Sequence, residues 1–418
     1  MIQALKGNVI SVPTPDTVCC VPNGYLVLDD GVIVGTFPTL PPEYADCAVV
    51  DYRDALIMQS FADMHLHAPQ YPMLGMGMDL PLLEWLNTYT FRTESRFADA
   101  DYARARYREL AHKLIQNGTT RVCMFSSLHT DATLILMEEL ERAGLCGYVG
   151  KVNMDRNSAP YYQETTEESE RETLRWLAAC DRFVNIKPIL TPRFTPSCSD
   201  ALMGWLGTLA AARNLPVQSH LSENMGEMDW VKTLHPDCEQ YWETYSKYGL
   251  WKSGTLMAHC VHCDARERAA MRAHGVTVVH CADSNINLAS GVAPIRQMLD
   301  EGLSVTLGSD IAGGAQLSML SVIQMTIRAS KMKRIQSEWE TPFLSVSEAF
   351  YLGTSAGAAY FGKGAGFCPG DKLHAVVIHD GELPDTGRLT CKERFERAVY
   401  MTDARDIIAV YSEGKRVK

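Results

Sequence analysis

The sequence has 418 residues, of which 46% are hydrophobic and 21% are charged, as in ordinary globular proteins. Its net charge of −11 and isoelectric point near 5.6 argue against nucleic acid or an anionic membrane as a partner, because such partners select basic patches. A small molecule is the expected partner. The length suggests about three domains, although α/β barrels of this size also form single units.

The amino-terminal segment lacks the basic stretch, apolar run and cleavage site of a signal peptide. No apolar run approaches the roughly 18 residues that a membrane span needs. The chain has thirteen cysteines, an odd number spread over its length, which is typical of reduced thiols in a cytosolic protein. These features predict a cytoplasmic protein.

Short β-rich runs, separated by Pro and Gly, occupy residues 1–56, and similar runs return at 373–379 and 407–411. We therefore expect the two ends of the chain to pair into a small β-sandwich subdomain, made of residues 1–56 and 367–418. The remaining residues, 57–366, would form an inserted domain.

The middle of the chain alternates strand-like and helix-like segments, the pattern of parallel β/α architecture. The strand-like segments are Ala62–His67, Arg121–Phe125, Tyr148–Asn153, Val184–Leu190, Val217–Leu221, Thr255–His259, Val276–His280 and Val305–Ser309. Eight strands close a (β/α)8 TIM-type barrel, which is the fold that we predict. The helix-like segments include Ala98–Gln116, Asp131–Ala143, Thr165–Ala179, Asp200–Arg213, Ala265–Ala273 and Ser318–Met332. Residues 68–97 form a long connection, where a lid or pocket wall is expected.

Polar side chains gather at the carboxyl ends of these predicted strands. In a barrel of this kind, that face carries the active site. A single buried histidine is more often a core residue than a functional one, but a set of six polar residues at one face indicates a site. The residues at the strand ends are His65, His67, His220, His259, His280 and Asp310.

The pair His65 and His67 projects to one side of an extended segment, because side-chain direction in a strand alternates. With His220 and Asp310 it offers three nitrogens and one oxygen to a single divalent ion, with room for a water. We expect Zn²⁺, and Fe²⁺ also suits this set. The ion would acidify the water and supply hydroxide near neutral pH. Asp310 would accept the water's proton, while His259 would orient the hydroxide.

Glu223 follows His220 by three residues, so its carboxylate can face a substrate and act as general acid and base if burial raises its pKa. The alternative is a charge in the first turn of the next helix. Lys187 could in principle bridge two metals after carbamylation. It precedes the strand end and is followed by Pro188, so we expect one metal.

Several motifs resemble the amidohydrolase superfamily in order and spacing: Phe61-Ala-Asp-Met-His-Leu-His67, His220, His259 and Ser309-Asp310. Others resemble the guanine deaminase family: His67-Ala-Pro-Gln-Tyr-Pro72, Asp79-Leu-Pro-Leu-Leu-Glu-Trp-Leu86, Thr191-Pro-Arg-Phe194 and His220-Leu-Ser-Glu223. The resemblance implies a barrel enzyme with one metal ion that hydrolyses guanine to xanthine and ammonia. A homodimer is the default for such an enzyme.

The same resemblance implies roles for the residues around the metal. Gln70 and Arg193 would hydrogen-bond the purine, Phe194 would lie beside its ring, and Trp85 would help to wall the pocket. Glu223 would protonate the ring nitrogen beside C2. Asp310 would then relay a proton to the departing amine.

Two alternatives remain open from the sequence. The same scaffold could act on a related amino-heterocycle, such as 8-oxoguanine, an amino-pterin or a triazine. A barrel that serves only as a binding or scaffold protein belongs to a different class. The scaffold is disfavoured because the chain keeps every metal ligand of the motif.

Overall fold

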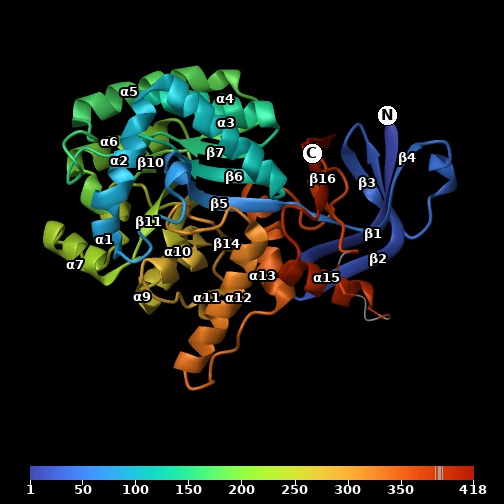
Figure 1. The fold of residues 1–418 in the computed structure, drawn as a ribbon. Helices are drawn as coiled ribbons and strands as arrows, with labels where there is room; N and C mark the ends of the chain where they lie inside the picture. Colours follow the sequence, from blue (N-terminus) through green and yellow to red (C-terminus); the bar gives the residue numbers. More distant parts are fainter. Residues whose placement is uncertain (382, 385–386, 388) are drawn as a thin grey trace.

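The computed structural model describes residues 1–418 except for 382, 385–386 and 388. Figure 1 shows a set of strands surrounded by helices, and beside it a sheet that combines the blue and red ends of the chain. None of the helices in the described part is long and apolar enough to cross a membrane. All thirteen cysteines are free thiols, as the sequence predicts.

The two ends of the chain build one seven-stranded sheet, in the order β17-β16-β15-β4-β1-β2-β3. Its strands are β1 (Ile2–Thr14), β2 (Thr17–Asp29), β3 (Val32–Phe37), β4 (Ala48–Gln59), β15 (Ala375–Ile378), β16 (Ile407–Ser412) and β17 (Lys415–Arg416). Met58 of β4 lies opposite Val376 of β15, which confirms the predicted pairing of the two ends. The hydrogen bonds give one continuous sheet, so the predicted two-layer sandwich is not confirmed.

The segment between these ends contains two four-stranded parallel sheets, in the orders β5-β6-β7-β9 and β11-β12-β13-β14. Their strands are β5 (Phe61–His67), β6 (Thr119–Phe125), β7 (Cys146–Gly150), β9 (Ile186–Pro188), β11 (Val217–Leu221), β12 (Thr255–His259), β13 (Thr277–His280) and β14 (Val305–Leu307). Each overlaps a predicted strand. Two short strands, β8 (Val152–Asn153) and β10 (Thr191–Pro192), pair in parallel. β8 follows β7 in the sequence, and β10 follows β9.

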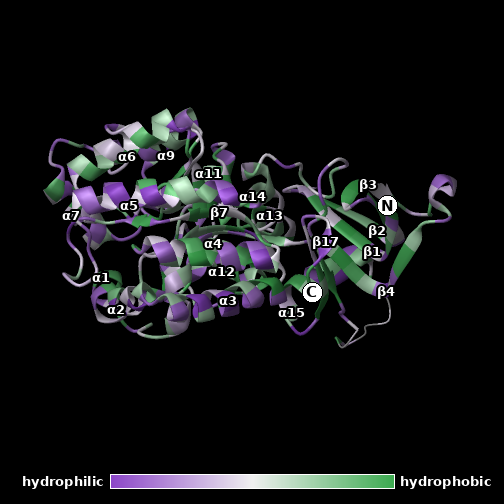
Figure 2. Ribbon diagram, turned by 90° about the horizontal axis from the view of Figure 1, so that it is seen from above, coloured by the Kyte–Doolittle hydropathy of each residue, from purple (hydrophilic) through white to green (hydrophobic). Residues whose placement is uncertain are grey.

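Six helices match the predicted segments to within a few residues. They are α3 (Ala100–Gln116), α4 (Thr130–Ala143), α5 (Thr166–Ala179), α6 (Asp200–Ala212), α9 (Ala265–His274) and α12 (Met319–Gln336). Thr165 and Glu168 form a capping box that starts α5, and Gly144 ends α4 in the left-handed conformation. Figure 2 shows hydrophobic and hydrophilic residues alternating along helices such as α5 and α12, as expected for helices with one buried face.

The remaining helices are short, and some were not expected. They are α1 (Leu82–Trp85), α2 (Phe91–Ser95), α7 (Met225–Leu234), α8 (Glu243–Ser246), α10 (Ala282–Asn287), α11 (Ile295–Asp300), α13 (Val346–Leu352), α14 (Ser355–Tyr360) and α15 (Cys391–Met401). The connection 68–97 folds into several of these turns, including the π-helical turn η3 (Leu86–Thr90). It is therefore an ordered wall that packs its apolar residues into a separate core cluster.

Candidate active site

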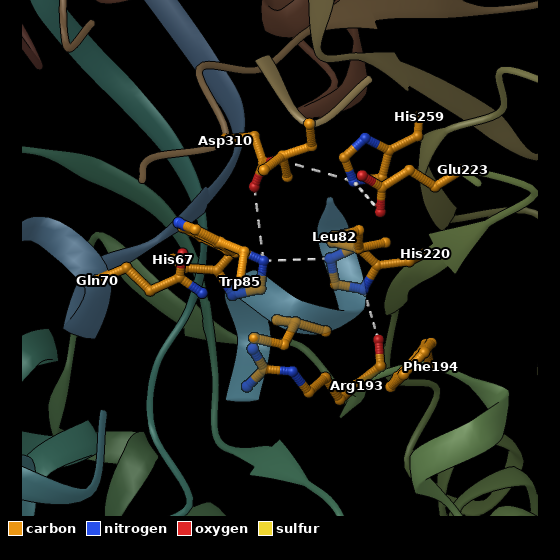
Figure 3. Close-up of a pocket in the computed structure, with 12 residues that line it drawn as sticks. His67, Gln70, Leu82, Trp85, Arg193, Phe194, His220, Glu223, His259 and Asp310 are labelled. Carbon is orange, nitrogen blue, oxygen red and sulfur yellow. Dashed lines mark hydrogen bonds and ion pairs between the residues drawn. The ribbon is translucent and has the colours of Figure 1, made fainter. Parts of the chain in front are cut away.

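The carboxyl ends of the parallel strands bring the predicted metal ligands together, and Figure 3 shows three of them, His67, His220 and Asp310. One ring nitrogen from each of His65, His67 and His220 lies within 4.8 Å of the others. Asp310, which follows β14, places Oδ1 3.2 Å from His65 Nε2 and 3.6 Å from His67 Nε2. All four side chains are buried. The structure thus assembles all four residues that the sequence predicts as ligands.

The hydrogen bonding of these histidines fits a cation between them. His220 Nδ1 lies 2.5 Å from the carbonyl oxygen of Arg193, and must donate to it, so Nε2 of His220 carries a lone pair. That Nε2 lies 3.1 Å from Nε2 of His67. Burial lowers the pKa of both rings well below 6.5 and keeps them neutral. His67 Nδ1 is also buried without a hydrogen bond. This donor set suits Zn²⁺ or a similar ion.

His259, which lies next to the ligand set, and Asp310, which belongs to it, have backbone conformations that are unusual for residues with a side chain. Their φ angles are +72° and +47°, values that cost energy and cluster at functional sites. His259 Nε2 lies 3.8 Å from Asp310 Oδ2, and its Nδ1 bonds Asn285 Oδ1 at 2.8 Å. Burial opposes ionisation of Asp310, but hydrogen bonding and charge from His65 and its neighbours lower its pKa, so it stays a carboxylate.

Glu223 is buried in the same cluster. Its Oε2 lies 3.5 Å from His259 Nε2, and its Oε1 accepts a hydrogen bond from Ser290 Oγ at 3.3 Å. Burial raises the pKa of Glu223 to about 7, as a general acid and base at neutral pH requires. The first-turn acid of α7 is Glu227, which accepts the backbone N–H of Glu223 at 3.0 Å. The alternative reading of Glu223 as a helix charge is therefore wrong.

A cavity of about 430 Å³, counted together with the open solvent at its mouth, lies beside these residues. The four residues that the sequence predicts as substrate contacts, Gln70, Trp85, Arg193 and Phe194, all line it (Figure 3). Apolar side chains complete the walls; these are Leu82, Leu86 and Leu288. Two of the three belong to the connection 68–97, so the prediction that this segment forms a pocket wall is confirmed.

Glu94 was not recognised from the sequence, although it organises the pocket. It is fully buried, and its carboxylate accepts hydrogen bonds from Arg193 Nη1 at 2.6 Å and Nη2 at 3.0 Å. It also accepts one from Gln70 Nε2 at 2.8 Å. Burial alone would lower the pKa of Arg193, but the Glu94 carboxylate outweighs burial and raises it. No local pattern marks Glu94, because Arg193 lies 99 residues away in the sequence.

Asp63 is a second buried acid that sequence reasoning missed. It accepts hydrogen bonds from the backbone N–H of Ser309 at 2.9 Å and from its hydroxyl at 2.5 Å. These bonds join β5 to the residue that precedes Asp310. The position of Asp63 two residues before His65 was visible in the sequence, but nothing there indicated its partner.

Two other residues weighed from the sequence lie outside the cluster. His280 ends β13 as predicted, yet it lines a different cavity beside α11 and α12, together with Arg296 and Thr326. The expectation that every strand-end histidine would face one site is therefore wrong for His280. Lys187 is exposed and donates to the carbonyl oxygen of Phe183 at 3.0 Å.

Comparisons with known proteins agree with this geometry. The model of the amidohydrolase family matches residues 56–417. A guanine deaminase of Dictyostelium discoideum is 36% identical over 390 residues, which cover 89% of this chain and 84% of that protein. The guanine deaminase of Homo sapiens is 37% identical, over 86% of this chain and 82% of that protein.

A solved structure is also similar along its whole length. It is a guanine deaminase from C. acetobutylicum with guanine bound in its active site, and it has a TM-score of 0.97 at 42% identity, with complete coverage of both chains. An E. coli guanine deaminase gives a TM-score of 0.90 at 28% identity, over 100% of this chain and 99% of that one. The chain therefore belongs to the amidohydrolase family and, within it, to the group that contains the guanine deaminases.

Proposed function

We propose that this protein hydrolyses guanine to xanthine and ammonia in the cavity described above. The observation that carries the proposal is one cavity whose wall contains the acid Glu223 and the polar pair Gln70 and Arg193 together with His67, His220 and Asp310, beside which His65 completes the His₃Asp set. The full-length similarity to a structure with guanine bound supports guanine as the substrate.

His65, His67, His220 and Asp310 would hold one divalent ion, Zn²⁺ in the first place and Fe²⁺ as the alternative. When bound, such an ion lowers the pKa of water and provides hydroxide near neutral pH. The rings of His67 and His220 are neutral, so they can bind the ion without first losing a proton.

The proton transfers would fall to two carboxyl groups that both lie near Nε2 of His259. Glu223 would protonate the ring nitrogen beside C2, because burial holds its pKa near neutrality. Asp310 remains a carboxylate and would accept the proton of the attacking water, then pass it to the departing amine. His259 would orient the attacking oxygen, with its own ring fixed by Asn285. As the amine leaves, the proton of the new C2 hydroxyl would return to Glu223, so that guanine and water give xanthine and ammonia and both carboxyl groups regain their starting states.

Recognition of the base would depend on the polar wall of the cavity. Arg193 can donate to a purine carbonyl oxygen, and Gln70 offers a donor and an acceptor. Phe194 and Trp85 would pack against the flat ring. Both aromatic rings are largely buried, with exposures of 7% and 2%, so they present fixed surfaces.

The test is turnover by the purified chain loaded with zinc. We expect guanine to be converted into equal amounts of xanthine and ammonia, measured by absorbance and by an ammonia assay. A panel with 8-oxoguanine, an amino-pterin and a triazine checks specificity. Efficient turnover of one of these with none of guanine would overturn the assignment of the substrate.

We also infer that the two four-stranded sheets form the halves of one (β/α)8 barrel. The bridge between Leu190 and Val217 joins them on one side, and the hydrogen bond from Asp310 N to His65 O, 2.8 Å long, joins them on the other. Residues 57–366 would be this barrel, with 1–56 and 367–418 as the β subdomain. The homodimer and the cytoplasmic location stay predictions.

A further inference from the structure

A third cavity, distinct from the active site and from the cavity beside α11 and α12, lies at the opposite end of the strands from the active site. It is beside the sheet formed by the chain ends. Its volume, counted together with the open solvent at its mouth, is about 330 Å³. The polar residues around it include Ser60, Arg121, Asp371, Lys372 and His374. Arg121 is near the start of β6, four residues before Phe125, whose ring lies 5.0 Å from that of His65. Four residues of strand span roughly 13 Å, so the two cavities are separate.

The guanidinium of Arg121 has no direct ion pair among the described residues, and the carboxylates of Glu413 and Asp371 attract it only from a longer distance. The residue is 8% exposed, and it makes neither a hydrogen bond nor an ion pair with any residue in the part of the chain that the structure describes. It lies on the same side of β6 as Cys123, which packs inside the ring of strands with Ala62. Its guanidinium therefore carries five N–H donors into the cavity. Burial lowers the pKa of Arg121, and the attraction of Glu413 and Asp371 offsets this only in part, so the buried charge is incompletely compensated.

The nearby acids are bound to other groups. Glu413 lies 3.2 Å from Lys372 Nζ and 3.0 Å from His374 Nε2. Asp371 accepts the backbone N–H of Gly364 at 2.7 Å. Burial lowers the pKa of His374 to about 4, so its ring is neutral near pH 7. Lys372 adds a second cation to the wall of the cavity.

A cation is the less suitable occupant. Cys146, His374 and Glu413 do lie close enough to share a metal ion. Burial, however, raises the pKa of the Cys146 thiol to about 12, so it holds its proton. Arg121 is the register neighbour of Cys146 on the adjacent strand, and its charge opposes a second positive charge there.

We propose that this cavity is a binding site for a small oxyanion, of the phosphate or carboxylate class, which pairs with the guanidinium of Arg121. Two oxygens of such an anion match the fork of a guanidinium. Lys372 and the hydroxyl of Ser60 lie on the same cavity wall. The bound anion would link β6 to residues 371–374, and so the β subdomain to the parallel strands (Figure 1).

The test is thermal unfolding of the full chain while inorganic phosphate replaces chloride at constant ionic strength and pH. We expect a saturable rise in Tm of roughly 1–3 °C, since a ligand that binds only the folded state stabilises it. Acetate in place of phosphate shows whether carboxylates bind as well. The readout does not involve turnover, so its outcome is independent of the proposed deaminase activity.

Arg121→Met should abolish the phosphate response, whereas Arg405→Met should keep it. Arg405 is exposed and pairs with Asp403, so it is a matched control for the loss of one arginine charge. If Arg121→Met fails to fold, Lys372→Met tests the site instead. The Lys372 side chain is 54% exposed, so its replacement should be tolerated, and it should weaken the response to phosphate several-fold. A wild-type protein without a response, or a response that both Arg121→Met and Lys372→Met retain in full, would refute the site.

Discussion

Glu94 and Arg193 form a buried ion pair with two hydrogen bonds, of 2.6 and 3.0 Å, and side-chain exposures of 0% and 3%. The same carboxylate accepts a hydrogen bond from Gln70, whose oxygen accepts the N–H of Ala312 at 3.0 Å. One acid thus fixes both side chains that are proposed to read the base. Glu94 is in this sense a positioning residue, which acts through its two partners.

Replacing Glu94 by Gln should therefore impair recognition. The change leaves the charge of Arg193 buried and unpaired, at a cost of about 3–5 kcal/mol. We expect kcat/KM for guanine to fall roughly 100-fold or more, with an increased KM, and Tm to decrease. Steady-state kinetics and thermal unfolding measure both effects. Metal content should stay constant, because Glu94 contacts no ligand.

Glu84→Gln is the matched control for this substitution. Glu84 lies on the same connection but is exposed, so its loss should leave kcat/KM and Tm unchanged. If Glu94→Gln behaved like this control, Glu94 would have no positioning role.

The difference between Glu94 and the metal ligands shows which parts of a site a sequence reveals. His65 and His67 are two residues apart on one strand, so strand geometry alone places them together. His220 and Asp310 come from other strands, but the carboxyl ends of parallel strands meet at one face of the fold. That rule is enough to predict that they lie near His65 and His67. Glu94 lies in a connection without any periodicity, and only the folded path of that connection brings it to Arg193.

His280 shows a different limit of sequence reasoning. Strands that are buried on both faces have near-continuous apolar sequences, so the pattern does not say which residues point inward. In β13, Val279 packs inside the ring of strands, and His280 therefore points to the helices. An error of one residue in register reverses the direction of a side chain. The same ambiguity hid Arg121, which the sequence shows only as one residue of an apolar strand.

Glu223→Gln should remove proton transfer while keeping the shape of the cavity. General acid and base catalysis contributes about 10²–10⁴-fold, so we expect kcat to decrease by that factor. Bound metal should be unchanged, since Glu223 is not a proposed ligand. Steady-state kinetics with guanine measure kcat, and elemental analysis measures the bound metal, so a loss of catalysis is distinguished from a loss of metal. Glu239→Gln, at an exposed ion pair with Arg266, should retain full activity. Near-normal kcat in Glu223→Gln would exclude it as the proton carrier.

Removal of the metal should abolish turnover. Treatment with a chelator is expected to inactivate the enzyme, and added zinc should restore it. His220→Asn should lower the bound metal well below one ion per chain, because a proposed ligand is lost. His280→Asn is the control. It removes a buried histidine at a strand end that faces the cavity beside α11 and α12, so the metal content should be retained. Equal metal loss in both variants would indicate a general folding defect.

His374 should make the stability depend on pH. Burial lowers its pKa from 6.5 to about 4, Arg121 adds to this effect, and Glu413 opposes it. In the unfolded chain, the ring binds a proton near pH 6.5, whereas in the folded chain it stays neutral down to about pH 4. The stabilisation is therefore complete above about pH 6.5 and is lost as the pH falls toward 4. By pH 5, the loss amounts to about 2 kcal/mol.

Thermal unfolding between pH 7.5 and 5 of the wild type and of His374→Gln measures this contribution. The amide of Gln does not titrate. The Tm of the variant should therefore decrease less than the Tm of the wild type as the pH falls from 7.5 to 5. The other buried histidines are the same in both proteins, and their effect cancels in the comparison. His112→Gln, at an exposed position, should follow the wild-type curve. Parallel curves for the wild type and His374→Gln would show that His374 binds a proton equally well in the folded and unfolded chains.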